Sequence, residues 1–285
     1  MKRAYLELIK LKQTGLLVWT AIAAYLAAAS NELEMIILIF LIGSIFLAIS
    51  GTTAISMYFD ADIDAIMERT KGRPIPSARV TSRNALMFGM ALLGLGLFLA
   101  LFLNWLVVTI IITGTIFNVI VYTIVLKRRT PFSILFGGIA GGMPTLAGWT
   151  AYTNKIELNG ILLALVIIAW IPTHILNLAM FYNYDYKKAN IPILPVVIGQ
   201  KRTREVILLS NIVLTTVAIS FFVLKIFGRT YIVLSIVPTL LFLFGSIYML
   251  VHPSKKLYWS LFKFSGPYLF LLYIAMIIDA ITPIF

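Results

Sequence analysis

Long runs of apolar residues recur along the whole chain, each closed by a short polar segment. The runs are about twenty residues long, which is the length that an α-helix needs to cross a bilayer. The pattern therefore predicts a series of membrane-spanning helices. We place nine of them at 13–30, 35–57, 84–103, 105–126, 132–152, 160–182, 204–226, 231–251 and 261–281.

Two of the polar connections, 58–83 and 183–203, are much longer than the others. Each follows an even-numbered span, begins with acidic residues, continues with basic ones and contains Ile-Pro, in "GRPIPS" and in "ANIPILPV". Connections that follow even-numbered spans share one face of the membrane. We therefore expect these two loops to close together over one site.

Composition agrees with the membrane interpretation. Of the 285 residues, 61% are hydrophobic and 12% are charged, whereas soluble domains are about 45–50% apolar and about 25% charged. We predict an all-α polytopic membrane protein in which residues 1–285 form one transmembrane domain around a central cavity. The first twelve residues show no cleavable signal, and the absence of Cys excludes disulfides and thiolate metal sites.

The net charge of +12 comes from Lys and Arg residues that fall mostly on one face of the membrane. If the N-terminus is cytoplasmic, all but three of the 23 Lys and Arg residues fall on the inner face, the exceptions being Lys155, Lys225 and Arg229. The positive-inside rule then predicts a cytoplasmic N-terminus and an outer C-terminus in the cell membrane. Most of the basic residues are thus explained by the orientation of the chain in the lipid bilayer, and we expect no nucleic-acid partner.

The stretch "MYFDADIDAIMERTKGRPIPS" places three aspartates at the inner end of the second span. On a helix Asp60 and Asp64 share a face with Ser56, while Asp62 points roughly the opposite way. Oxygen ligands without Cys or a nearby His suit Mg²⁺, which binds one or two carboxylates together with water and substrate phosphate. Alternatively, the acids pair with the cations that follow them as a solvated helix end.

Basic residues on the same inner face would complete a site for a diphosphate, whose oxygens bind Mg²⁺ and cations. Asp185, in "YNYDYKKANIPILPV", is the acid of the second long loop. A plain stop-transfer anchor is an alternative for the triplet at 127–129. The candidate substrate-binding residues of this face are Arg69, Lys71, Arg73, Tyr122, Lys127 and Arg128.

His174 lies within the sixth span, and Asn177 follows three residues later. Ionisable residues inside a membrane are often functional, although a buried hydrogen-bonding role is equally consistent with this pattern. The glycines of "GGIAGGMPTLAGW" either admit a bulky ligand or let helices pack closely. Asp279, near the outer end, has no evident partner in the sequence.

The strings "DADIDAIMERTKGRPIPS", "YTIVLKRRTPFSILFGGIAGGMPTLAGW" and "DYKKANIPILPVV" resemble the UbiA-type intramembrane prenyltransferases. The resemblance covers about 10–205 and is greatest to the members that transfer a farnesyl group to protoheme IX. It implies nine helices around a cytoplasmic-side cavity, and Mg²⁺ held by Asp60, Asp64 and Asp185. It also implies loss of diphosphate from farnesyl diphosphate and addition of the allylic cation to a heme vinyl group. Separately from the resemblance, we hypothesise that His174 orients the heme, near either its iron or a propionate.

The chain departs from the family pattern at four places. Ser56 stands where the first acidic motif opens with Asn, and Tyr184 precedes Asp185 where two acids are usual. Tyr182 replaces an Arg, and Lys10-Leu11-Lys12 replaces Lys-Pro-Arg. The position of Asp60 and Asp64 is unaffected, and the number of metal ions stays open.

Other functions remain compatible with the sequence. A UbiA-type enzyme for an aromatic or lipid acceptor would use the same diphosphate site. A secondary transporter of an anion also has intramembrane acids, but it places its charges near the midplane, whereas here they gather at one face. A structural subunit of a membrane complex would need none of the acids.

Overall fold

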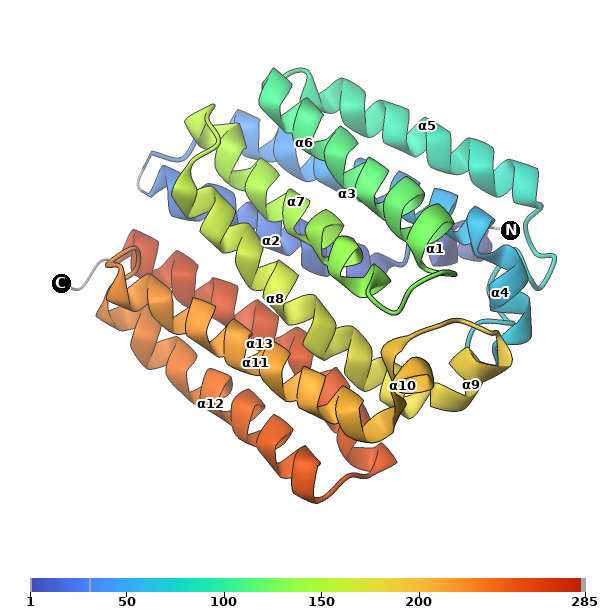
Figure 1. The fold of residues 1–285 in the computed structure, drawn as a ribbon. Helices are drawn as coiled ribbons and strands as arrows, with labels where there is room; N and C mark the ends of the chain where they lie inside the picture. Colours follow the sequence, from blue (N-terminus) through green and yellow to red (C-terminus); the bar gives the residue numbers. More distant parts are fainter. Residues whose placement is uncertain (1, 31, 283–285) are drawn as a thin grey trace.

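The computed structural model describes residues 2–30 and 32–282, and in these ranges it contains helices and no strand. The long helical segments of the described chain run side by side as one bundle (Figure 1). Each overlaps one predicted span. They are α2 (Leu11–Ala29), α3 (Met35–Phe59), α5 (Ser82–Ala100), α6 (Trp105–Thr115) continued by the π-helix η1 (Ile116–Leu126), α7 (Ser133–Thr153), α8 (Leu158–Phe181), α11 (Gly199–Val223), α12 (Arg229–Val251) and α13 (Lys255–Ile281).

Seven of these segments are long and apolar enough to cross a membrane. The other two, α2 and α7, carry more Ala, Gly and Thr. Both run through the middle of the bundle in Figure 1, and most residues of α7 are buried, with α2 and α8 as its main neighbours. A helix packed among other helices meets little lipid, and small residues there let the backbones approach closely. The protein is therefore a multi-pass membrane protein, and two of its central helices are rich in small residues.

Short helices occupy the ends of the bundle rather than its length. The first long loop contains α4 (Ala61–Ile66), and the second contains α9 (Asn183–Lys188) and α10 (Leu194–Val197). Figure 1 shows these three helices at the same end as the N-terminus, which begins with α1 (Lys2–Leu8), and the C-terminus at the opposite end.

The two long loops contact each other, as the sequence predicts. The backbone N–H of Arg69 donates to the carboxylate of Asp185 at 3.1 Å, and the ammonium of Lys188 lies 3.5 Å from the carboxylate of Glu68. The loops therefore cover one end of the bundle together.

Candidate active site

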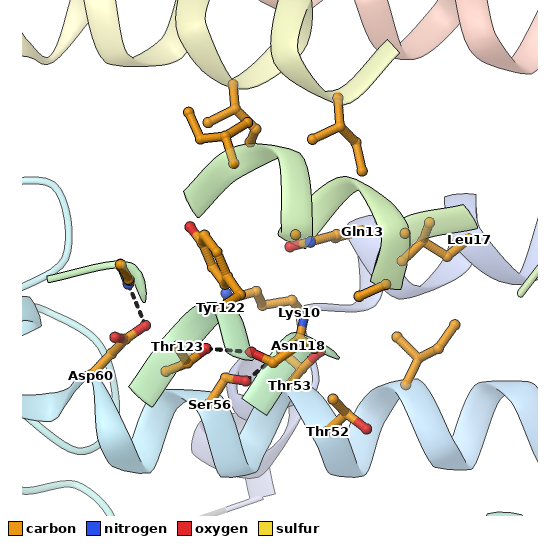
Figure 2. A pocket seen from close by; sticks show the side chains of 18 of the residues that line it. Lys10, Gln13, Leu17, Thr52, Thr53, Ser56, Asp60, Asn118, Tyr122 and Thr123 are labelled. Carbon is orange, nitrogen blue, oxygen red and sulfur yellow. Dashed lines mark hydrogen bonds and ion pairs between the residues drawn. The ribbon is translucent and has the colours of Figure 1, made fainter. Parts of the chain in front are cut away.

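A cavity of about 630 Å³ lies between α2, α3, η1, α7 and α8, beside the two long loops. Figure 2 shows Asp60 at one end of the pocket and Leu17 at the other. Charged side chains line the end near the loops, and apolar and aromatic side chains such as Ile45, Ile171 and Phe262 line the remainder. The cavity thus has a polar end and an apolar body.

Asp60 and Asp64 line this cavity together with Ser56, which confirms the predicted shared helical face. The helical path continues from α3 into α4, since the backbone N–H of Asp60 donates to the carbonyl of Ser56 and that of Asp64 to the carbonyl of Asp60. Each carboxylate has a cation beside it. Lys127 Nζ lies 2.5 Å from Asp60 Oδ2, and Arg73 Nη1 lies 2.6 Å from Asp64 Oδ2.

Asp62 faces away from the cavity, also as predicted. Its side chain is 64% exposed and receives two hydrogen bonds of 2.7 Å from the guanidinium of Arg128. The hydrogen bond from Arg128 is the main reason that the pKa of Asp62 lies below its usual value. Arg128, which we expected to bind substrate, does not line the cavity, because its side chain is turned outward toward Asp62.

The π-helix η1 forms the cavity wall beside α3, and its wider turn decides which of its side chains face the cavity. Its wider turn is seen where the N–H of Lys127 donates to the carbonyl of Tyr122, five residues back. Asn118, Tyr122 and Thr123 line the cavity (Figure 2), and Lys127 lines it too. Burial opposes the charge of Lys127, but the charge and hydrogen bond of Asp60, together with the neighbouring Tyr122 and Tyr186, outweigh it, and the pKa of Lys127 is raised. Tyr122 and Lys127 therefore lie where the sequence predicts them, on an element that it does not predict.

Three residues at the start of α2 also line the polar end: Lys10, which caps the helix, and Lys12 and Gln13 within it. Lys10 has a left-handed backbone, with φ 45°, and its side chain makes no ion pair with a carboxylate of the described residues. Burial, followed by repulsion from Arg73 and Lys127, lowers the pKa of Lys10 to about 7. The sequence analysis used Lys10 and Lys12 only for topology and for their departure from a family motif, and it did not single out Gln13, so all three are additions to the candidate site.

Asp185 is buried next to the cavity but does not line it. Its carboxylate accepts the backbone N–H of Arg69, whose guanidinium lies over the ring of Tyr182 at 5.5 Å. Arg69 does line the cavity. In this arrangement Asp185 holds the segment that carries Arg69, and it is separate from the pair formed by Asp60 and Asp64.

Two further candidates lie away from the cavity. Lys71 is exposed and pairs with Glu68 on its own loop. Asn177 is fully buried and donates to the carbonyl of Thr173 one turn earlier. The side chain at i+3 from His174 thus points into the helix packing, although His174 itself lines the cavity.

The glycines of α7 divide between the two uses that the sequence left open. Gly137 and Gly141 line the cavity. Gly138 and Gly142 face α8, where a Cβ on Gly142 would lie 2.9 Å from the carbonyl oxygen of Ala164. Some of these small residues therefore leave room in the cavity, and others let α7 and α8 pack closely.

The polar end fits a magnesium ion by its chemistry. In residues 2–30 and 32–282 no three His, Asp or Glu side chains form a ready-made metal cage. Asp60 and Asp64 nevertheless offer carboxylate oxygens, and Asp60 Oδ1 is buried without a hydrogen-bond partner. Mg²⁺ is commonly held by one or two carboxylates plus substrate phosphate. The available donors match that requirement.

Polar residues within the spans are the part of the site that sequence reasoning largely missed. Ser56 donates to Asn118 Oδ1 at 2.7 Å, and the hydroxyls of Thr52 and Thr115 are 3.1 Å apart. These pairs join α3 to the segment formed by α6 and η1. Their signal in the sequence was the spacing of Thr52 and Ser56 by one helical turn within an apolar run.

Comparison with known proteins gives a consistent result. The model of the UbiA prenyltransferase family matches residues 17–274. Protoheme IX farnesyltransferase of Korarchaeum cryptofilum is 41% identical over 274 residues, covering 96% of this chain and 92% of the relative. The enzyme of the same name from Archaeoglobus fulgidus is 36% identical over 277 residues, covering 97% of each chain.

Solved structures share the fold. A structure from work on a digeranylgeranylglyceryl phosphate synthase superposes with a TM-score of 0.81 at 25% identity, covering 99% of both chains. A UbiA homolog from Archaeoglobus fulgidus bound to DMAPP and Mg²⁺ superposes with a TM-score of 0.74 at 17% identity, covering 98% of this chain and 99% of that one.

Proposed function

The chain belongs to the UbiA prenyltransferase family and is therefore a prenyltransferase, and we propose that it transfers the farnesyl group of farnesyl diphosphate to a vinyl side chain of protoheme IX, forming heme O. The observation that carries this proposal is the division of the cavity into a charged end beside the loops and an apolar body between the helices. Such a cavity suits a substrate with a diphosphate head and a hydrocarbon tail. The shared name of the relatives supports farnesyl and heme as the substrates.

The diphosphate would bind at the charged end. Arg69, Arg73, Lys127 and Lys10 line that end and present N–H donors to phosphate oxygens. Lys127 and Arg73 are held by Asp60 and Asp64, so they are positioned before substrate arrives. Asp185 would act indirectly, by holding the backbone of Arg69.

Asp60 and Asp64 would hold Mg²⁺, with the unpartnered Oδ1 of Asp60 as one ligand. When bound, the ion neutralises charge on the departing diphosphate. Lys127 and Arg73, released from the two carboxylates, would add their own charges to the leaving group. The carboxylates and their cations thus exchange partners when substrate binds.

The apolar body of the cavity would protect the reactive intermediate. The bond between C1 of the farnesyl chain and the diphosphate oxygen breaks, and its electron pair leaves with the diphosphate. The vinyl π electrons of heme then attack C1. The resulting cation beside the macrocycle takes a hydroxyl from water, which releases a proton. Isoleucine and aromatic side chains keep water from the first cation until the vinyl group has reacted.

The orientation of the chain is part of the proposal. The basic end of the bundle carries the N-terminus, both long loops and the charged end of the cavity. By the positive-inside rule, this end would face the cytoplasm and the C-terminus would lie outside.

The product of the reaction tests the proposal. Membranes that contain the chain are incubated with radiolabelled farnesyl diphosphate, Mg²⁺ and either heme or 4-hydroxybenzoate, and extracts are analysed by mass spectrometry. We expect heme with a hydroxyethylfarnesyl group, absent from membranes that carry Asp60→Ala together with Asp64→Ala. A prenylated benzoate or lipid without modified heme would assign the chain to a different acceptor.

A further inference from the structure

His174 is the imidazole of the cavity. The sequence contains two His, and the other, His252, is exposed beyond the end of α12. His174 lies on α8, is partly buried, and lines the apolar body of the cavity with Trp170 and Phe262. Its ring is stacked on that of Trp170, with 4.3 Å between centroids, and lies 4.5 Å from that of Phe262. These neighbours hold the plane of the imidazole.

Ser265 on α13 fixes the protonation of that ring. Its Oγ donates to the carbonyl of Phe262 at 2.6 Å, which uses the one hydrogen of the hydroxyl. The same Oγ lies 2.6 Å from His174 Nδ1 and can therefore only accept there. Nδ1 must carry the proton. The neutral ring then has an unprotonated Nε2.

Nε2 has no partner in the described chain. It makes no hydrogen bond, and it is not among the buried polar atoms that lack one, so it is open to the cavity that His174 lines. The arrangement here, with one nitrogen donating to a fixed oxygen and the other free, is the one that metal-binding histidines show.

The backbone of Ser265 also secures a neighbour of the imidazole. Its carbonyl accepts the indole N–H of Trp170 at 2.9 Å. One residue of α13 thus holds both the tautomer of His174 and the ring stacked on it. Met67 and Met143 also line the cavity, but no described hydrogen bond orients either thioether.

Accordingly, and resting on the proposed function, we propose that Nε2 of His174 is an axial ligand of the heme iron in the bound acceptor. Ser265 is the positioning residue that keeps Nε2 unprotonated and directed into the cavity. Coordination would hold the macrocycle in the apolar body while the diphosphate occupies the charged end.

Spectroscopy of the ferric heme complex tests this assignment. The purified full-length protein is titrated with heme without farnesyl diphosphate, and the Soret band and electron paramagnetic resonance spectrum are recorded. Labelling with [¹⁵N]histidine addresses only two residues. We expect a nitrogen hyperfine coupling to iron that is lost in His174→Ala, kept in His252→Ala and Met143→Leu, and replaced when free imidazole is added to His174→Ala.

Ser265 is tested with a conservative pair. Ser265→Ala should weaken heme affinity by about tenfold, as is common when the hydrogen-bond partner of a metal-binding His is removed. Ser265→Thr, which keeps the hydroxyl, should restore both affinity and spectrum. If Ser265→Ala unfolds the protein, the His174 labelling still decides the ligand.

The outcomes distinguish a failure of the iron-ligand assignment from a failure of the proposed farnesyl transfer to heme. Heme that is bound and farnesylated while His174→Ala retains the wild-type spectrum and affinity would overturn the iron ligand alone. A chain that neither binds nor farnesylates heme, yet prenylates an aromatic acid, would overturn both.

Discussion

The aspartates Asp60, Asp62 and Asp64 are close in sequence but lie in different environments. Asp60 and Asp64 line the cavity and face Lys127 and Arg73. Asp62 lies in solvent with Arg128. Exposed ion pairs contribute about 0–1 kcal/mol, so the pair between Asp62 and Arg128 is a surface contact of the loop. The difference between these aspartates is set by the helical turn, which separates residues by face.

Replacing these aspartates one at a time should reveal that difference. Asp60→Ala or Asp64→Ala should lower farnesyl transfer by about a hundredfold or more, because several kcal/mol of charge stabilisation depend on the metal position. Asp62→Ala should change it by less than about threefold. Initial rates with radiolabelled farnesyl diphosphate, normalised to the amount of protein in the membrane, provide the measurement. Equal losses in all three variants would contradict the division of faces.

Lys10 should give diphosphate binding a particular pH dependence. Its pKa in the empty protein is about 7, below the usual 10.5, because burial and then nearby cations oppose its charge. A bound diphosphate favours the charged form, so binding takes up a proton above pH 7. Affinity should therefore fall as pH rises from about 7 toward 10, by at most tenfold per pH unit, and should not depend on Lys10 titration below 7.

The comparison with Lys10→Met isolates this residue. Pyrophosphate titrates in both proteins alike, so its own ionisation cancels in the ratio of the two inhibition constants. We expect the ratio to be largest, and constant, below about pH 7 and to approach one at high pH. A ratio that stays constant from pH 6 to pH 9 would show that Lys10 does not exchange a proton with the site.

The close packing of α3 against α5 depends on glycines at their interface. A Cβ on Gly51 of α3 would lie 2.5 Å from the carbonyl oxygen of Gly89 on α5, and one on Gly96 would lie 2.6 Å from the backbone nitrogen of Ala48. These contacts involve backbone, which cannot move aside as a flexible side chain does. Small residues at membrane helix interfaces permit such close approach. Close packing against α5 therefore supports α3, the helix that Asp60 directly follows.

Alanine at Gly96 should destabilise the protein, whereas alanine at Gly94 should not. Gly94 lies on the same helix with nothing within 4 Å of its Cβ position. Gly96→Ala should lower stability by about 1–3 kcal/mol through overpacking, and Gly94→Ala should leave it unchanged or raise it slightly because alanine favours helix. Thermal unfolding in detergent measures both. Similar melting temperatures for the two variants would refute close α3–α5 packing.

At the scale of the whole molecule, the bundle separates its two ends. The charged end of the cavity, the N-terminus and both long loops lie together, and the C-terminus lies at the other end (Figure 1). A diphosphate can then be bound at the membrane surface while its hydrocarbon tail extends between the helices. The same separation is the basis of the orientation proposed for the chain in the bilayer.

Cysteine labelling should report that orientation directly. The sequence contains no Cys, so each introduced cysteine is the only thiol. Lys71→Cys, in the first long loop, should react with a membrane-impermeant maleimide only in inverted vesicles. Lys155→Cys, between α7 and α8, should react in intact cells, and the unaltered chain should react in neither. The reverse pattern would overturn the proposed orientation.

The sequence by itself determined the helical spans, the face shared by Asp60 and Asp64 and the two loops that meet. These features follow from local properties, since bilayer thickness sets the length of an apolar run and helical geometry sets which residues share a face. The bulge of η1 is also local, yet no sequence period predicted it, because a π-helix differs from an α-helix by one residue per hydrogen bond.

Only the tertiary structure decided which side chains meet. Lys127 reaches Asp60 from 67 positions away, and Ser265 reaches His174 from 91. Asp279, without a partner in the sequence, accepts the backbone N–H groups of Gly228 and Tyr231 at the start of α12. Such pairs depend on how distant helices pack, and packing is fixed by the shapes of many side chains together. A linear pattern records what each helix carries but not which helix stands beside it.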